Sequence, residues 1–405
     1  MTAATFRLTL WPLALATHLA CSDAALADTG TLLDFDIGLR VQSDSNPDLT
    51  PVSPGTDVTG GVDLSFSLTS ETALSRLSLT GSLGLLSADE ADGTSGFSDP
   101  GLTLSYARTT ATAALTLDVG LQDAAGNNGA VTNFDTGTGR QQIASLNAAL
   151  QLGTAGPLGF GLNAGVTDLR YRDTSDPALL DSRTVTLAGD LRLDLSPVLH
   201  LTLGLDDRRF DQDGADLRET QSLDLGLTLD RPTGALGLEV TAADTPEGQR
   251  LGASFEHQID LAAGSVTYSL GATRGVRDRT YVTGALNYAQ ELPGGSLTLG
   301  LLRAVQPSPD TDAETLLLTS SLGYRHAVTP NANLALALNW AEQRDTSSDL
   351  ATANTNLSAT WTQSLTPDWA LDLGYTHLLR NADTTGHGQS DQVSLTLHRA
   401  FSLRF

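Results

Sequence analysis

Charged side chains gather in the middle of the chain, several of them two residues apart. Residues at i and i+2 share one face of a β-strand, so these charges are expected to collect on one surface. Opposed acids and bases there could create a field that selects passing solutes, or they could pair across strands and support the sheet. The set comprises Asp190, Arg192, Asp194, His200, Asp206, Arg208, Asp224, Glu239 and Glu256. Because acids outnumber bases, a field would favour cations.

Catalysis would require a nucleophile or a histidine with an orienting polar partner. Beyond the first 27 residues the histidines are scattered singly, and His257 and His377 share spacing with apolar neighbours. His387 is the one histidine with an acid, Asp383, in the same expected loop. The sequence therefore predicts that the protein is not an enzyme.

Two further motifs resemble ligand sites only in part. Asp211 to Asp216 resembles the start of a calcium loop, yet the bidentate Glu at the twelfth position is missing. Gly156 to Gly165 keeps an apolar alternation through Leu158, Phe160 and Leu162, which is typical of a strand and not of a phosphate loop. We expect a hairpin tip and a strand there, with no metal and no cofactor.

The elements that must position the charges are β-strands. In the segment Leu32 to Gln42, apolar residues at odd positions alternate with polar or small ones, a period that a strand can use and a helix cannot. The last segment, Gln392 to Phe405, repeats the pattern and ends on an aromatic residue. Its apolar positions are Val393, Leu395, Leu397, Phe401, Leu403 and Phe405.

Strands of this kind recur along the whole chain, joined alternately by tight turns and by longer polar segments. Counting them gives about 20, with both chain ends on the side of the tight turns. The long or acidic segments include Asp244 to Gly248 and Ala124 to Gly137, of which the latter is the best candidate for a loop that folds inward. The fold class expected is all-β, a closed antiparallel up-and-down transmembrane β-barrel, because backbone groups in a bilayer must pair internally. A secreted tandem of β-sandwiches is the alternative.

The polar face of these strands would line the barrel lumen. It is mostly small and neutral, as at Asn333, Ala335, Ala337, Asn339, Asn354, Asn356, Ser358, Thr360 and Thr362. Such a lining leaves room for water in a barrel of about 16 strands or more.

The first residues resemble a secretory signal. Arg7 precedes an apolar run, and small residues end in Ala25-Leu26-Ala27. We expect cleavage after Ala27, leaving residues 28–405 as one domain, with lipidation of Cys21 as the alternative. Cys21 is the single cysteine, so the mature chain would have no disulfide.

Charge and hydropathy exclude some partners. The net charge is −24 and every basic side chain is arginine, so nucleic acid is not an expected partner, since phosphate binding needs clustered cations. No run of about 18 apolar residues follows the signal segment. The mean hydropathy of −0.07 suits strands with one apolar and one polar face.

The closing strand resembles that of bacterial outer-membrane β-barrels, in which the terminal aromatic, here Phe405, is the insertion signal for the barrel-assembly machinery. The mature chain as a whole resembles the β-barrel porin families of Gram-negative bacteria. The resemblance implies an outer-membrane location, short periplasmic turns, long extracellular loops, and contact with outer-membrane lipid and lipopolysaccharide. It also implies passive diffusion of small hydrophilic solutes. A non-conducting structural or adhesion barrel, or a polysaccharide-export component, is the alternative. The oligomeric state stays open, and aromatic residues, at 5% of the chain, are scarce for such a family.

Overall fold

A computed structural model describes residues 30–86, 96–125, 131, 139–174, 179–307, 314–384 and 386–405. The expected signal peptide, residues 1–27, lies outside the described residues. So does most of the segment Ala124 to Gly137, the candidate for an inward loop.

The described chain forms twenty β-strands of 11 to 19 residues. Since about 9 to 11 residues suffice for a tilted strand to cross the hydrocarbon core of a membrane, the ends of most strands project beyond that core. In chain order the strands are β1 (Thr31–Asp44), β2 (Asp57–Glu71), β3 (Ser75–Leu86), β4 (Gly96–Thr109), β5 (Ala113–Ala125), β6 (Arg140–Leu152), β7 (Leu158–Arg172), β8 (Ser182–Ser196), β9 (Leu199–Gln212), β10 (Arg218–Arg231), β11 (Gly234–Thr245), β12 (Gly248–Leu261), β13 (Gly264–Arg274), β14 (Thr280–Leu292), β15 (Gly295–Pro307), β16 (Glu314–Thr329), β17 (Ala332–Asp345), β18 (Ala351–Ser364), β19 (Trp369–Ala382) and β20 (Gly386–Arg404).

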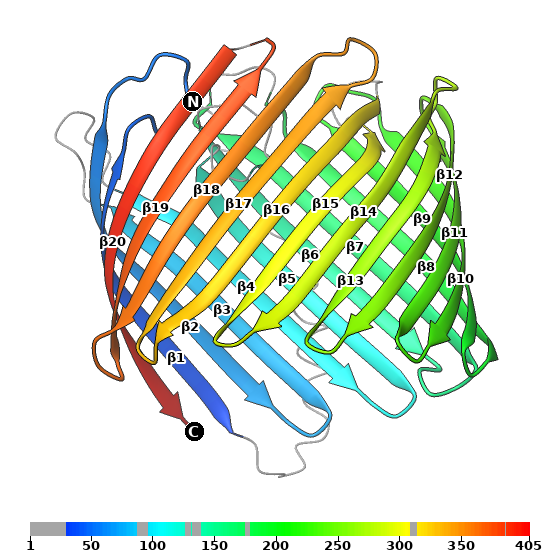
Figure 1. Ribbon diagram of the computed structural model, residues 1–405, viewed down its shortest axis with the longest axis horizontal. Helices are drawn as coiled ribbons and strands as arrows, with labels where there is room; N and C mark the ends of the chain where they lie inside the picture. The colour runs from blue at the N-terminus through cyan, green and yellow to red at the C-terminus, as the bar shows by residue number, and fades with distance from the viewer. Residues whose placement is uncertain are drawn as a thin grey trace, which may run out of the picture.

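The strands form one closed antiparallel barrel (Figure 1). Each strand pairs with its neighbours in the sequence, and β1 also pairs with β20, with Phe35 opposite Phe401. At the seam, the backbone N–H of Phe405 donates to the carbonyl oxygen of Thr31 at 2.9 Å, and the N–H of Thr31 returns a bond to Phe405 at 3.2 Å. Closure removes the unpaired strand edges that a membrane would not tolerate, so the predicted fold class and strand number are confirmed.

The two ends of the barrel differ. The end that holds Thr31 and Phe405, at the bottom of Figure 1, carries tight turns such as Pro197 and Val198 between β8 and β9. We call it the short-turn end, and the opposite end the long-loop end. In outer-membrane barrels these ends face the periplasm and the cell exterior, respectively.

One long loop expected from the sequence is not a loop. Asp244 to Gly248 was expected to form one, yet β11 runs to Thr245 and β12 starts at Gly248, so Pro246 and Glu247 alone make the connection. The Thr245 hydroxyl donates to the Gly248 carbonyl at 2.8 Å, and Gly248 adopts a φ of +136°, which a residue with a Cβ rarely takes. A glycine and a capping hydroxyl thus allow a tight reversal where composition suggested a longer one.

The outer face of the barrel is apolar. Leu39, Leu162, Leu205 and Leu270 are each more than half exposed, and they occupy the alternate positions predicted to face outward. Soluble proteins seldom expose contiguous apolar surface of this extent, whereas lipid would cover it. No helix among the described residues is long and apolar enough to cross a membrane.

Candidate functional site

The inner wall is the candidate functional surface, because the polar face of every strand points there. All nine charged residues named from the sequence lie on this face of β8 to β12, at positions that alternate with outward leucines such as Leu187, Leu205 and Leu225. Their ion pairs divide them into two groups.

The first group lies at the short-turn end and is internally paired. The carboxylate of Asp194 is 3.2 Å from Nε of Arg192 and 2.7 Å from Nδ1 of His200. The other ring nitrogen of His200 lies 3.0 Å from Asp230, two strands away from Asp194. Arg192 also donates to carbonyl oxygens of the β6–β7 turn, at 3.0 Å from that of Gly156. These contacts tie four consecutive strands together and support the wall.

The second group is not paired. Within the described chain, no ion pair of 4 Å or less involves these residues, although they share one lumen face. The group is Asp190, Asp206, Arg208, Asp224, Glu239 and Glu256. With five acids and one base, it gives this part of the wall a negative field, and solvent can reach it because Asp190, Arg208, Glu239 and Glu256 are exposed.

Glycines on neighbouring strands accommodate these side chains. The carboxylate of Asp190 occupies the space that a Cβ at Gly161 would need. Gly204 and Gly237 lie opposite Asp224 and Glu256 across a strand pair, where an added Cβ would make an ordinary contact of 3.5 Å. The glycine at position 161 therefore lets Asp190 lie close to the wall.

A further polar cluster at the barrel seam was not predicted. The imidazole of His398 lies between Asp36 and Asp372, at 3.1 and 3.2 Å. The Ser402 hydroxyl donates to Asp34 at 2.5 Å. Asp34 and Asp36 alternate with apolar residues in the first strand, so their lumen position was predictable, but their partners lie at the far end of the chain.

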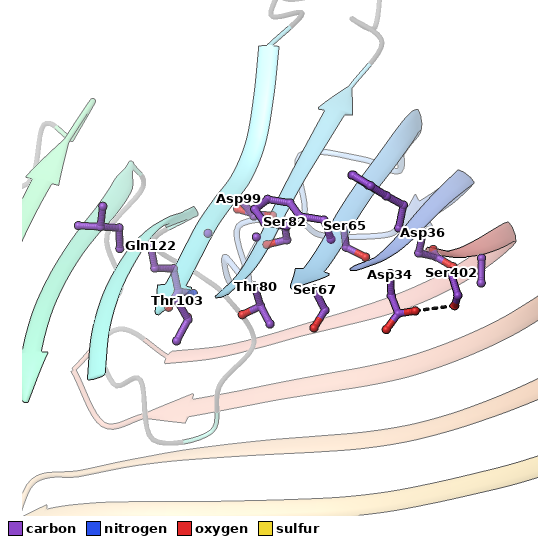
Figure 2. A pocket seen from close by; sticks show the side chains of 16 residues that line it. Asp34, Asp36, Ser65, Ser67, Thr80, Ser82, Asp99, Thr103, Gln122 and Ser402 are labelled. Atoms are coloured by element: carbon purple, nitrogen blue, oxygen red, sulfur yellow. Dashed lines mark hydrogen bonds between the residues drawn. The ribbon is translucent and has the colours of Figure 1, made fainter. Parts of the chain in front are cut away.

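The seam cluster borders a hollow of about 580 Å³ in the inner wall of β20 and β1 to β5. Figure 2 shows short hydroxyl and carboxylate side chains standing around it on successive strands. The polar side chains are Asp34, Asp36, Ser65, Ser67, Thr80, Ser82, Asp99, Thr103, Gln122 and Ser402. Such a surface can hydrogen-bond hydrated cations or polyhydroxylated solutes. No group of three or more metal-ligating side chains occurs in the described part of the chain.

One described residue of the β5–β6 connection reaches the opposite wall. The backbone carbonyl oxygen of Val131 accepts a hydrogen bond from Nδ2 of Asn354 at 3.0 Å. Asn354 belongs to β18, on the lumen face, and is 8% exposed. This contact places the backbone of Val131 against the lumen face of β18.

The two weaker motifs of the sequence have ordinary places. Asp383, the expected neighbour of His387, instead accepts the backbone N–H of Ala351 at 2.9 Å. The acidic run Asp211 to Asp216 spans the end of β9 and its hairpin tip, where Gly214 has a φ of +79°.

Sequence comparison does not identify this protein. No family model matches the chain, and no curated protein matches it.

Solved structures match at the level of the fold. The siderophore receptor PirA from Pseudomonas aeruginosa aligns with a TM-score of 0.51 and 11% identity, over 91% of this chain and 80% of the receptor. A mutant of the ferric enterobactin receptor PfeA from the same organism gives 0.53 and 12%, with the same coverage. OccK9 (OpdG), also from P. aeruginosa, gives 0.43 and 13%, over 93% of this chain and 99% of its own. The two receptors share the fold of this chain, whose closed topology and apolar exterior are those of a large transmembrane β-barrel.

Proposed function

We propose that the protein is a water-filled channel of the bacterial outer membrane for passive diffusion of small hydrophilic solutes, with a preference for cations. The observation that carries the proposal is the unpaired acidic group on the inner wall of β8 to β12. Carboxylates whose only function was to support the wall would be paired, as Asp194 is with Arg192 and His200. Unpaired carboxylates facing water attract counter-ions and repel anions.

The rest of the lumen suits the same function. The inner faces of β17 and β18 consist of small neutral side chains, including Asn333, Ala337, Asn356 and Ser358. A barrel of about 16 strands or more is wide enough for an aqueous channel. The contact between Val131 and Asn354 supports a narrower passage at the long-loop end.

Planar-bilayer recording tests the proposal. We expect the purified protein to form ohmic channels whose reversal potential in a salt gradient indicates cation preference. A variant that replaces Asp190, Asp206, Asp224, Glu239 and Glu256 with their amides should keep the conductance and lose the preference. Anion preference of the native protein would refute the role of the acids. Absence of conductance from correctly folded protein would instead support the non-conducting structural, adhesion or polysaccharide-export alternative.

Two partners belong to the proposal. The side chain of Phe405 is 72% exposed, so it is accessible to the barrel-assembly machinery as the insertion signal. Lipopolysaccharide is the outer-leaflet lipid that would meet the long-loop end. We propose no catalytic function and no cofactor.

A further inference from the structure

Five arginines lie on the outer face of the barrel, at the long-loop ends of β6 to β9. We call them the outer arginine belt: Arg140, Arg170, Arg172, Arg183 and Arg209. Each arginine is an even number of residues away from an outward leucine of its own strand and so lies on the same face. These leucines are Leu146, Leu162, Leu187 and Leu205. Their side chains therefore point away from the lumen, unlike the acids of the inner wall.

The belt is placed where a membrane tolerates charge. An arginine facing lipid costs about 2–4 kcal/mol at the bilayer midplane and about 0–1 kcal/mol near the interface. Arg140 is the first residue of β6 and Arg172 the last of β7, so both lie at the extreme end of their strands. The outward leucines of these strands lie closer to the middle of the barrel wall. The belt thus lies at the level of the outer-leaflet headgroups.

The surface beneath the belt is a groove of about 790 Å³ with two kinds of lining. Leu102, Leu121 and Ala144 provide an apolar floor, while Arg170 and Arg172 stand at the long-loop side together with Asp123 and Asp168. A second hollow, of about 290 Å³, shares Asp168 and Arg170, but Asp181, Asp211 and Asp213 also line it, so it is too acidic to take part in anion binding. An amphipathic ligand with acyl chains below and an anionic head above would match this arrangement.

Most of the belt is already neutralised. Arg140 pairs with Asp123 at 2.6 Å, and Arg170 and Arg183 share Asp168 at 3.2 and 2.7 Å. Arg209 lies 3.3 Å from Glu219 and 3.1 Å from Asp207.

Arg172 differs from the other four. It is exposed, and no ion pair of 4 Å or less involves it within the described residues. It is also the direct cross-strand partner of Arg140. Like charges directly opposite one another destabilise a sheet. Asp123 offsets part of this repulsion, because it pairs with Arg140 and also interacts electrostatically with Arg172, and a bound anion would offset the rest. Guanidinium groups bind phosphate in bidentate geometry.

We propose that this groove binds a phosphorylated glycolipid of the outer leaflet. The phosphate would lie on Arg172 and Arg170, and the acyl chains would lie against Leu102 and Leu121. Asp123 and Asp168 hold Arg140 and Arg170 in place. The negative charges of these carboxylates also weaken the binding of anions that have no acyl chains. The proposal does not depend on whether the barrel conducts.

The test compares the double variant R170Q/R172Q with R344Q, a matched control. Arg344 is an outward arginine at the long-loop end of β17, on the other wall, and pairs with Glu342 at 2.9 Å. Binding of bisphosphorylated lipid A to the detergent-purified barrel is measured by native mass spectrometry. Heat-modifiable gel migration verifies that each variant is folded.

We expect saturable binding to the native barrel and to R344Q, and an affinity loss of about tenfold in R170Q/R172Q. Lipid A without its phosphates should bind to the native protein as weakly as lipid A binds to the double variant. Inorganic phosphate at equal concentration should not compete with lipid A for the native barrel. Equal affinity of all three proteins for lipid A would overturn the proposal, as would equal binding of the dephosphorylated lipid. Competition by inorganic phosphate would assign the arginines to a soluble anion instead.

Discussion

Asp206 and Asp207 are consecutive residues of β9 whose carboxylates lie on opposite faces of the barrel wall. Asp207 faces outward and lies 3.1 Å from Nε of Arg209. Asp206 faces the lumen, diagonal to Asp224 on β10, whose partner in register is Gly204. Asp207 therefore pairs with an arginine on the outer surface, whereas Asp206 adds negative charge to the inner wall.

This relationship gives a matched pair of variants for ion selectivity. We expect Asp206→Asn to lower the cation-to-anion permeability ratio by about twofold. The reason is that one charge a few ångströms from a permeating ion in water changes the energy of that ion by less than about 1 kcal/mol. Asp207→Asn should leave the ratio unchanged. Reversal potentials in a salt gradient measure both. The same ratio change in both variants would show that the inner wall is not the source of selectivity.

The paired group at the short-turn end should matter for stability and not for selectivity. Replacing His200 with Ala removes the bridge between Asp194 and Asp230, which leaves Asp230 without its ion-pair partner and Asp194 with Arg192 alone. We expect a lower urea midpoint for unfolding in detergent, with an unchanged reversal potential. His387→Ala, at an exposed histidine near the start of β20, is the control and should keep the native midpoint. A selectivity change in His200→Ala would place this group in the field of the channel.

The sequence alone predicted the fold because the alternation of apolar and polar residues assigns each side chain to a face. The same alternation placed all nine charges on the inner wall. It could not say which of them pair, because pairing depends on the register between strands. His200 meets Asp194 and Asp230 only because three neighbouring strands are aligned with one another.

The closure of the barrel is the other feature that the alternation of apolar and polar residues does not predict. His398 and Asp36 are 362 residues apart in the sequence, and they meet because β20 pairs with β1. The outer arginine belt was missed for a related reason. In the sequence, its arginines lie near the polar ends of separate strands. They form one surface only because β6 to β9 lie side by side.

Phe405 allows backbone pairing to be separated from recognition of its side chain. Phe405→Ala keeps the two backbone hydrogen bonds to Thr31, so refolding into detergent and heat-modifiable migration should be as in the native protein. In cells, we expect several-fold less folded barrel in the outer membrane, because the exposed aromatic group is lost. Native levels in cells would mean that the ring is not the insertion signal.

At the rim, Asp345 ends β17 and caps the connection to β18 beyond the membrane. Its Oδ1 accepts the Ser347 hydroxyl at 2.5 Å and the N–H groups of Ser347 and Ser348 at 2.6 and 2.9 Å. These hydrogen bonds, that of the Ser347 hydroxyl above all, hold the pKa of Asp345 below its usual value. A depressed folded pKa means that the stabilisation is complete above the unfolded pKa, about 3.9, and is lost as the pH falls through the folded pKa.

The consequence is a pH-dependent difference between the native protein and Asp345→Asn. Near neutral pH the variant should have the lower urea midpoint, and the two midpoints should converge below about pH 4, as the native carboxylate gains its proton. Asp349→Asn, in the same connection, serves as the control. A difference that persists unchanged at acidic pH would mean that the carboxylate charge contributes nothing to this cap.

The contact between Val131 and Asn354 can be tested by cross-linking across the lumen. V131C/N354C should be joined in high yield by a short bismaleimide, because the carbonyl oxygen of Val131 and Nδ2 of Asn354 are 3.0 Å apart. V131C/T362C is the control. Thr362 faces the lumen from the same strand, but it lies eight residues farther along, or about 26 Å at about 3.3 Å per residue, which is beyond the reagent's reach. Mass spectrometry of the digested protein identifies the linked peptides. Equal yields from the two pairs would show that Val131 does not rest on the wall at Asn354.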